Sequence, residues 1–350
     1  MTILRYWGLI EITFVIVFIS FVIKGLWRKA KERKRLGKTK LPESFGGKAW
    51  YIFKYVFRII GVGVGTLVFI TLVIMIERVI LSVYSETAPA PSTVEIPADL
   101  AFDVEEVTFQ SEDGVKIAGW FVPSQNGATV ILLHGYGGNR TATIWYAERL
   151  TQAGYGVLMY DERASGESGG DRRSYGWEDP RDVGGALDYL ASRPDAGEEV
   201  GILGCSIGGQ IALQGAAYHP GIAAVWADGP SSVRAQDVSG PENPLVDLVI
   251  VGNYLLDWTY ELKLGIEPPA PMIDIIGTIS PRPVMIVAGG VSKSVLGSES
   301  DHVRKMVQHA GENAELWIIP EVTHCDGPAR RPDEYATRMV EFFNAAFGIK

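Results

Sequence analysis

The sequence is poor in cysteine and in histidine. It contains two cysteines, Cys205 and Cys325, and five histidines. Two cysteines do not make the framework of several disulfides that holds small extracellular domains together. A disulfide between them would require their two loops to meet. We favour the interpretation that both are small residues that fill space in the core.

Basic residues are scarce over most of the chain. Residues 79–350 contain 18 Lys and Arg against 37 Asp and Glu, a net charge of −19. Nucleic acid and anionic lipid headgroups repel such an acidic domain at long range, so we expect no nucleic-acid partner. The basic residues gather instead in residues 24–58, where 12 Lys and Arg accompany two glutamates.

Charged residues are nearly absent from two stretches close to the N-terminus. Residues 7–23 are apolar except for Glu11, and residues 59–76 contain no charge. The second stretch would form about 27 Å of helix, close to the hydrocarbon thickness of a bilayer. We predict two transmembrane helices, over about 7–24 and 59–81. A cleaved signal peptide is the alternative for the first, but no small-residue cleavage site follows it.

The charge pattern predicts the topology and the division of the chain. The basic residues of the loop between the two helices indicate that this loop is cytoplasmic. Both termini would then lie on the other side of a cell membrane. Residues 1–84 would form this two-span anchor, and a proline-rich stretch over 85–96 is typical of a linker. The domain then occupies 97–350, with a small cap over about 230–282. Apolar side chains of the cap either cover an acyl pocket or pack on one another.

Within that domain, apolar runs of strand length alternate with stretches of helical character. The first two runs, over 102–111 and 115–124, are joined by the hairpin signal E-D-G. This alternation predicts an α/β fold, with a mostly parallel sheet covered by helices on both faces and an antiparallel hairpin at one edge. The other predicted strands are 129–133, 156–160, 200–203, 223–226, 284–288 and 316–319, and the predicted helices are 143–153, 181–192, 209–218, 302–310 and 332–347.

The most specific motif is the pentapeptide G-C-S-I-G over residues 204–208, which lies between a predicted strand and a predicted helix. A serine on a sharp turn in that context is typical of a nucleophile elbow, where glycines permit a turn too tight for side chains. Ser206 is therefore the candidate nucleophile. Because a serine hydroxyl is unreactive at neutral pH, it needs a base, an acid that orients the base, and donors for an oxyanion.

Candidates for the base and the acid follow the last strands. His324 lies just after the final predicted strand, where a loop residue can reach the carboxyl edge of the sheet, and we predict that it is the base. The acid should follow the strand over 284–288, and the carboxylates of that loop are Glu299 and Asp301. Asp301 also fits the N-cap of the next helix, so we favour Glu299. Asp228, after another strand, stays a third option.

Two backbone amides are candidates for the oxyanion hole. One belongs to Ile207, the residue after the nucleophile, and the other should come from the loop H-G-Y-G-G-N over 134–139. We assign the second donor to Tyr136. A flexible glycine loop would explain the glycines, but not their position directly after a central strand.

Four blocks of the sequence resemble the α/β-hydrolase superfamily. They are the H-G loop at 134–139, the D-E-R-A-S-G-E-S turn at 161–168, the elbow followed by Gly209, and His324. The nearest resemblance is to the serine aminopeptidase-like and dienelactone-hydrolase-like branch, which contains many esterases. The sequence departs from the family's pattern at Ala164, where glycine is usual, and after residue 288, where G-x-x-D is missing and a glutamate is allowed as the acid.

The resemblance implies a membrane-anchored serine hydrolase with no metal or organic cofactor. Its expected substrate is a small or lipid-like carboxylic ester or thioester. One alternative is a peptidase of the aminopeptidase type, which would hold the substrate amine with a carboxylate of the cap, for which Glu242, Asp247, Asp257 and Glu261 are available. The other alternative is a catalytically inactive hydrolase fold that serves as an interaction module at the membrane.

Overall fold

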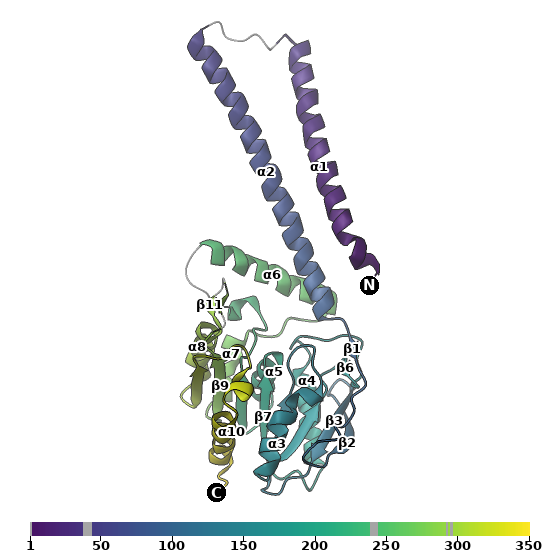
Figure 1. Ribbon diagram of the computed structural model, residues 1–350, viewed down its shortest axis with the longest axis vertical. Helices are drawn as coiled ribbons and strands as arrows, with labels where there is room; N and C mark the ends of the chain where they lie inside the picture. The colour runs from purple at the N-terminus through teal and green to yellow at the C-terminus, as the bar shows by residue number, and fades with distance from the viewer. Residues whose placement is uncertain (1, 38–43, 239–243, 292, 295–296) are drawn as a thin grey trace. The chain divides into compact units, whose positions relative to one another are not determined.

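The computed structural model describes residues 2–37, 44–238, 244–291, 293–294 and 297–350, and their side chains except those of 2–15, 26, 244–251, 293–294 and 297. Contacts along the chain divide it into two units, residues 1–81 and 82–350 (Figure 1). Each unit is described by itself below.

The first unit contains two helices, α1 (Thr2–Arg35) and most of α2 (Phe45–Glu86). In the part of the chain that the structure describes, α2 is the one helix that is long and apolar enough to cross a membrane. It includes the predicted span over 59–81 and extends beyond it at both ends. The aromatic rings of Phe18 and Phe69 stack between the two helices, with centroids 4.6 Å apart.

The prediction of two spans is therefore corrected to one candidate span. The first predicted span, over about 7–24, lies in α1, and its side chains up to residue 15 lie outside the described residues. In the sequence, the apolar run over 7–23 includes Glu11, whereas residues 59–76 contain no charge.

Eight strands form the central sheet of the second unit, in the order β12-β9-β8-β7-β4-β5-β3-β2 (Figure 1). From β12 to β5 all neighbours are parallel, whereas β3 is antiparallel to β5 and to β2. The predicted sheet, with its antiparallel hairpin at one edge, is confirmed. The strands are β2 (Glu105–Gln110), β3 (Lys116–Val122), β4 (Ala128–Leu133), β5 (Gly156–Tyr160), β7 (Glu199–Cys205), β8 (Ala224–Asp228), β9 (Val284–Gly289) and β12 (Ala314–Ile319).

Helices cover both faces of this sheet, as the apolar runs of its central strands require. In β4, Ile131 and Leu133 join one buried core and Val130 and Leu132 the other, because successive side chains point to opposite faces. Helices α4, α5 and α8 pack into the first core, and α3 and α10 into the second. Their bounds are α3 (Ile144–Gln152), α4 (Pro180–Ala191), α5 (Ile207–Tyr218), α8 (Glu299–Ala310) and α10 (Pro332–Phe347).

Short elements complete the unit. The predicted cap contains η2 (Ala235–Asp237), α6 (Pro244–Leu264), α7 (Met272–Ile275) and η3 (Ile276–Ile279). The segment predicted as a linker, 85–96, lies against the domain, because its strand β1 (Ala90–Pro91) pairs with β6 (Ser165–Gly166). The remaining elements are η1 (Arg140–Thr143), β10 (Lys293–Ser294), β11 (Gly297–Ser298) and α9 (Gly327–Arg330).

Candidate active site

Ser206 occupies the sharp turn between β7 and α5. Its φ is +60° and its ψ is −121°, a conformation that residues with a side chain rarely adopt. Such backbone strain costs on the order of 1–3 kcal/mol and persists only where the surroundings hold it. Here the Ser206 N–H donates to the carbonyl oxygen of Asp228 at 2.8 Å. The turn thus has the strand–serine–helix geometry that the pentapeptide predicts.

The glycines of the pentapeptide permit close backbone contacts around this turn. A Cβ added at Gly204 would overlap the backbone of Gly208, and one added at Gly208 would lie 2.6 Å from the carbonyl oxygen of His134. The loop after β4 also approaches the serine, because a Cβ at Gly135 would lie 3.6 Å from the Cβ of Ser206. A side chain at 204 would therefore push the strand away from the start of α5, and one at 208 would push the elbow away from the loop that should supply an oxyanion donor.

His324 and Glu299 form a hydrogen-bonded pair at the carboxyl edge of the sheet. The Nδ1 of His324 lies 2.6 Å from the Oε2 of Glu299, and the Oε1 of Glu299 accepts a 2.7 Å hydrogen bond from the N–H of Gly289. Both carboxylate oxygens are thus held. The hydrogen bond with Glu299 raises the pKa of the His324 imidazole above its ordinary value of 6.5, although partial burial opposes the shift.

The other two candidate carboxylates have different partners. Asp301 closes a capping box at the start of α8, where its Oδ2 accepts from the Ser298 N–H at 3.0 Å. Asp228 is buried, and its Oδ2 accepts a 2.8 Å hydrogen bond from the Tyr335 hydroxyl. Burial raises the pKa of Asp228 to about 6, against the effect of that hydrogen bond. Of the three carboxylates, Glu299 is the one that the structure pairs with His324.

A disulfide joins Cys205 to Cys325, so the interpretation of both cysteines as small core residues is wrong. Their Cα atoms are 6.2 Å apart although 120 positions separate them in the sequence. The loops of Ser206 and His324 converge at Asp228 and the residue that follows it, where the Cys325 Sγ lies 3.5 Å from the Asp228 carbonyl oxygen. The sequence did contain a signal. Cys205 directly precedes Ser206 and Cys325 directly follows His324, and these two candidate residues have to lie close together in a serine hydrolase.

Removal of this disulfide is expected to lower the stability of the domain. A cross-link that closes a loop of this length stabilises a protein by about 2–5 kcal/mol, mainly because it constrains the unfolded chain. We expect the double variant Cys205→Ala/Cys325→Ala to unfold at a lower temperature than the wild type, by calorimetry without reductant. Reductant should lower the wild-type Tm toward that of the variant and leave the variant unchanged. Equal unfolding temperatures under non-reducing conditions would contradict the stabilising role.

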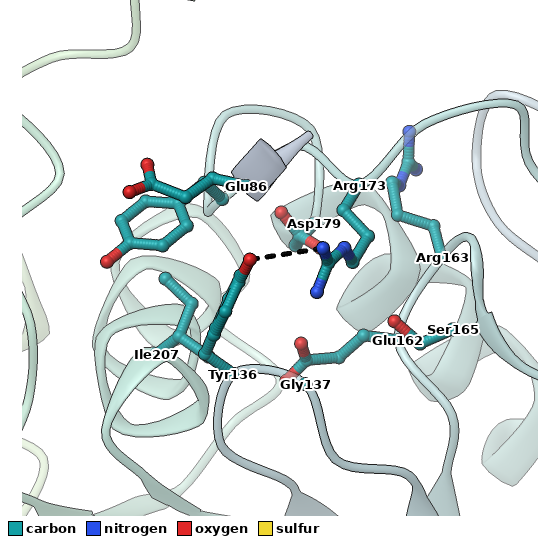
Figure 2. A pocket seen from close by; sticks show the side chains of 10 residues that line it. Glu86, Tyr136, Gly137, Glu162, Arg163, Ser165, Arg173, Asp179 and Ile207 are labelled. Atoms are coloured by element: carbon teal, nitrogen blue, oxygen red, sulfur yellow. Dashed lines mark hydrogen bonds between the residues drawn. The ribbon is translucent and has the colours of Figure 1, made fainter. Parts of the chain in front are cut away.

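The loop over 134–139 is held by a contact that the sequence motifs do not reveal. The guanidinium of Arg173 lies over the ring of Tyr136, with its Cζ 4.5 Å from the ring centroid. Its Nη2 also donates to the Tyr136 hydroxyl at 3.1 Å (Figure 2). The same Arg173 donates to the carbonyl oxygens of Ser85 at 3.0 Å and Ala88 at 2.6 Å. The last turn of α2 and the segment after it therefore support the candidate oxyanion loop.

A small polar cavity lies beside the two candidate oxyanion donors (Figure 2). Glu162 points into it and is buried, and its Oε1 has no hydrogen-bond partner among the described residues. Burial, reinforced by the charge of Asp179, raises the pKa of Glu162 well above its ordinary value, which favours the neutral carboxylic acid. The cavity is lined by Glu86, Tyr136, Gly137, Glu162, Arg163, Ser165, Arg173, Tyr175, Asp179 and Ile207.

Two of the four carboxylates proposed for binding a substrate amine have described side chains. Asp257 is buried and accepts 3.0 Å hydrogen bonds from the Arg234 Nε and from the Ala235 N–H. Glu261 is exposed on α6. Glu242 and the side chain of Asp247 lie outside the described residues. Across the part of the chain that the structure describes, no group of three or more His, Cys, Asp or Glu could hold a metal ion.

Comparisons with known proteins concern the family and the fold. The family model described as serine aminopeptidase S33 matches residues 124–257. The chain is 28% identical over 260 residues to the uncharacterized protein YfhR of Salmonella typhimurium. This alignment covers 71% of this chain and 84% of YfhR. The structure of the Pyrococcus furiosus esterase Pf2001 superposes with a TM-score of 0.58 at 26% identity, covering 73% of this chain and 98% of that one. The fold is that of an α/β-hydrolase.

The structure of an esterase from Exiguobacterium antarcticum, EaEST, is similar to this α/β-hydrolase in fold alone, with a TM-score of 0.51 at 18% identity. The superposition covers 68% of this chain and 99% of EaEST. The predicted resemblance to α/β-hydrolases and to the serine aminopeptidase family is confirmed. The matched family region lies within the second unit, residues 82–350.

Proposed function

We propose that this α/β-hydrolase is a membrane-anchored serine hydrolase that cleaves carboxylic esters or thioesters. One observation supports it above all: His324, which pairs with Glu299 at 2.6 Å, lies on a loop that a disulfide ties directly to the strained turn of Ser206. Nucleophile, base and orienting acid then follow one another along the chain in the order Ser206, Glu299, His324. A fluorophosphonate that labels Ser206 covalently tests the proposal, because it reacts only with an activated serine.

The proposed reaction proceeds through an acyl-enzyme. The Oγ of Ser206 attacks the ester carbonyl carbon while the Nε2 of His324 accepts its proton, and Glu299 stabilises the resulting imidazolium through Nδ1. The backbone N–H groups of Ile207 and Tyr136 donate to the tetrahedral oxyanion. His324 then gives the proton to the leaving alcohol or thiol as the acyl–oxygen or acyl–sulfur bond breaks. Water, deprotonated by His324, attacks the acyl-serine and releases the carboxylic acid.

Esters are favoured over peptides by the engagement of Asp257, one of the four cap carboxylates, and by a structural relative. A peptidase of the aminopeptidase type would need a carboxylate available for the substrate amine. Asp257 is already engaged by Arg234 and a backbone N–H. The Pyrococcus furiosus protein with the similar structure is described as an esterase. Both observations support an ester or thioester as the substrate of this chain.

The proposed location of the catalytic domain is extracytoplasmic. Residues 24–58, with their 12 Lys and Arg, precede the apolar part of α2, and such basic segments stay on the cytoplasmic side. The domain follows α2 and would therefore lie on the opposite side. The disulfide supports this assignment, since disulfides persist in oxidising compartments. The same orientation follows whether α2 alone or both predicted helices cross the membrane.

Ester hydrolysis is expected to lose activity as the pH falls through the pKa of His324. The imidazole must be neutral to accept the serine proton, and its pKa is raised above 6.5 by the hydrogen bond with Glu299. The acidic limb of kcat/KM should therefore have its midpoint above that value, with full activity at higher pH. Measurement with a water-soluble p-nitrophenyl ester between about pH 5 and pH 9 checks this. A midpoint below 6.5 would contradict the pairing.

A further inference from the structure

The outer face of α6 carries an exposed apolar stripe. The side chains of Tyr254, Trp258 and Leu262 are 50%, 57% and 64% exposed. Residues four positions apart lie on the same face of a helix, so the three form one row. The opposite face of α6 is buried through Tyr260 and Leu264. A surface helix normally presents polar residues outward, so this row needs a partner.

The C-terminal half of α6 contacts the last turn of α2. The Tyr260 hydroxyl donates to the carboxylate of Glu86, and the Lys263 Nζ lies 5.1 Å from the centroid of the Tyr84 ring. Tyr84 is itself 57% exposed. These residues of α2 belong to the same unit as α6, which begins at residue 82. Along the helix, Glu86 follows residue 81 by only about 7.5 Å.

We propose that α6 lies in the interface of the bilayer that anchors α2, with Tyr254, Trp258 and Leu262 inserted among the lipid headgroups. This inference rests on the membrane anchoring in the proposed function. Trp and Tyr are the residues enriched at membrane–water interfaces, and interfacial helices bury their apolar face about 5–10 Å deep. The bilayer is chosen as the occupant because α6, which carries the stripe, contacts the end of the candidate span through Tyr260.

The charge of the domain indicates which lipids the stripe contacts. Residues 79–350 have a net charge of −19, and the exposed Glu261 lies on α6 beside the stripe. Electrostatic attraction to anionic headgroups therefore does not drive the contact. Apolar and aromatic burial does, so α6 should insert into zwitterionic phosphatidylcholine bilayers.

Stacked rings connect α6 with the candidate oxyanion loop. The ring of Tyr260 stacks on that of Tyr175, with centroids 5.7 Å apart, and Tyr175 contacts Tyr136 edge to face at 6.0 Å. A helix seated in the headgroup region would thus hold the site close to the bilayer surface. The substrate class that fits this arrangement is an amphiphilic ester dissolved in the membrane.

Site-directed fluorescence on the full chain in phosphatidylcholine nanodiscs tests the position of α6. The native cysteines form a disulfide, so Trp258→Cys and Leu262→Cys can each be labelled with an environment-sensitive fluorophore. The matched control is Tyr218→Cys, which is 45% exposed at the end of α5. Because α5 starts at the elbow and runs back along the sheet, Tyr218 lies toward the edge opposite the candidate site.

Lipids that carry a nitroxide near the headgroup should quench the fluorophore at 258 and at 262 at least about twofold more than at 218, since such quenching requires contact with the interface. Equal quenching at all three positions would overturn the proposal. So would quenching that appears only when two copies share a nanodisc, since the stripe would then bind a second chain. This readout does not depend on enzymatic activity, so it is independent of the proposed reaction.

Hydrolysis provides a second readout. For Trp258→Ser/Leu262→Ser we expect the KM for a long-chain ester presented in the bilayer to rise about tenfold, as lost apolar burial weakens the interfacial contact. The kcat/KM for a short water-soluble ester should stay within about twofold of the wild type. An equal loss on both substrates would indicate a structural role and contradict the proposal. If the wild type hydrolyses neither ester, the proposed function fails, while the quenching experiment still decides the position of α6.

Discussion

Ser206→Ala is expected to remove nearly all ester hydrolysis and all labelling by a fluorophosphonate. Nucleophile, base and acid act as a unit, so loss of the serine alone costs as much as loss of the whole set, about 10⁴- to 10⁶-fold in kcat. Alanine keeps a Cβ at the strained position, where φ is +60°, and the elbow should retain its shape. The disulfide through the neighbouring Cys205 also remains. The expected loss is therefore chemical rather than structural.

Ser231→Ala is the matched control. The N–H of Ser231 donates to the Ser206 carbonyl oxygen at 3.3 Å, so the two serines share one neighbourhood. Its alanine variant should keep activity and labelling close to the wild-type level. Retention of more than about a tenth of wild-type hydrolysis by Ser206→Ala would refute the nucleophile assignment, given the size of the expected loss. A folded wild type that the probe does not label would favour the inactive interaction module.

The sheet could be predicted from the sequence because its strands are buried on both faces. Residues 129–133 and 156–160 are continuous apolar runs, and they match β4 and β5 closely. Elements of only two residues gave no such pattern. The two-residue strands β1 and β6 depend on pairing between segments that are far apart in the sequence, Ala90 with Ser165. Local composition contains no information on such a pairing.

The same distinction applies to the site. Ser206, His324 and Glu299 were accessible from the sequence because each follows a strand, and parallel strands bring their carboxyl ends to one edge. The role of Arg173 could not be predicted from the sequence, because its contacts with Tyr136 and Ser85 join positions that are 37 and 88 residues apart. No motif marks such a residue. The disulfide was weighed and set aside because a separation of 120 residues says nothing about distance in space.

Glu299→Gln is expected to lower kcat by about 10²- to 10⁴-fold, the effect of neutralising the acid that orients a catalytic histidine. Glutamine has nearly the same shape, and its carbonyl oxygen can still accept the hydrogen bond from the Gly289 N–H that Glu299 accepts at 2.7 Å. What disappears is the negative charge 2.6 Å from the Nδ1 of His324. Without it the imidazolium that forms in the transition state is less stable, and steady-state hydrolysis of a p-nitrophenyl ester measures the loss.

The pH profile separates this role from a structural one. The hydrogen bond with Glu299 is the main reason that the pKa of His324 is raised, so Glu299→Gln should move the acidic limb of kcat/KM to lower pH. Asp301→Asn is the matched control on the same helix turn. The amide oxygen of Asn can still accept the capping-box hydrogen bond from the Ser298 N–H, so this variant should keep its activity within about twofold and its acidic limb unchanged. The reverse outcome would assign the role of the acid to Asp301. In that case Asp301→Asn would show a large loss of kcat and a shifted acidic limb, and Glu299→Gln would show neither.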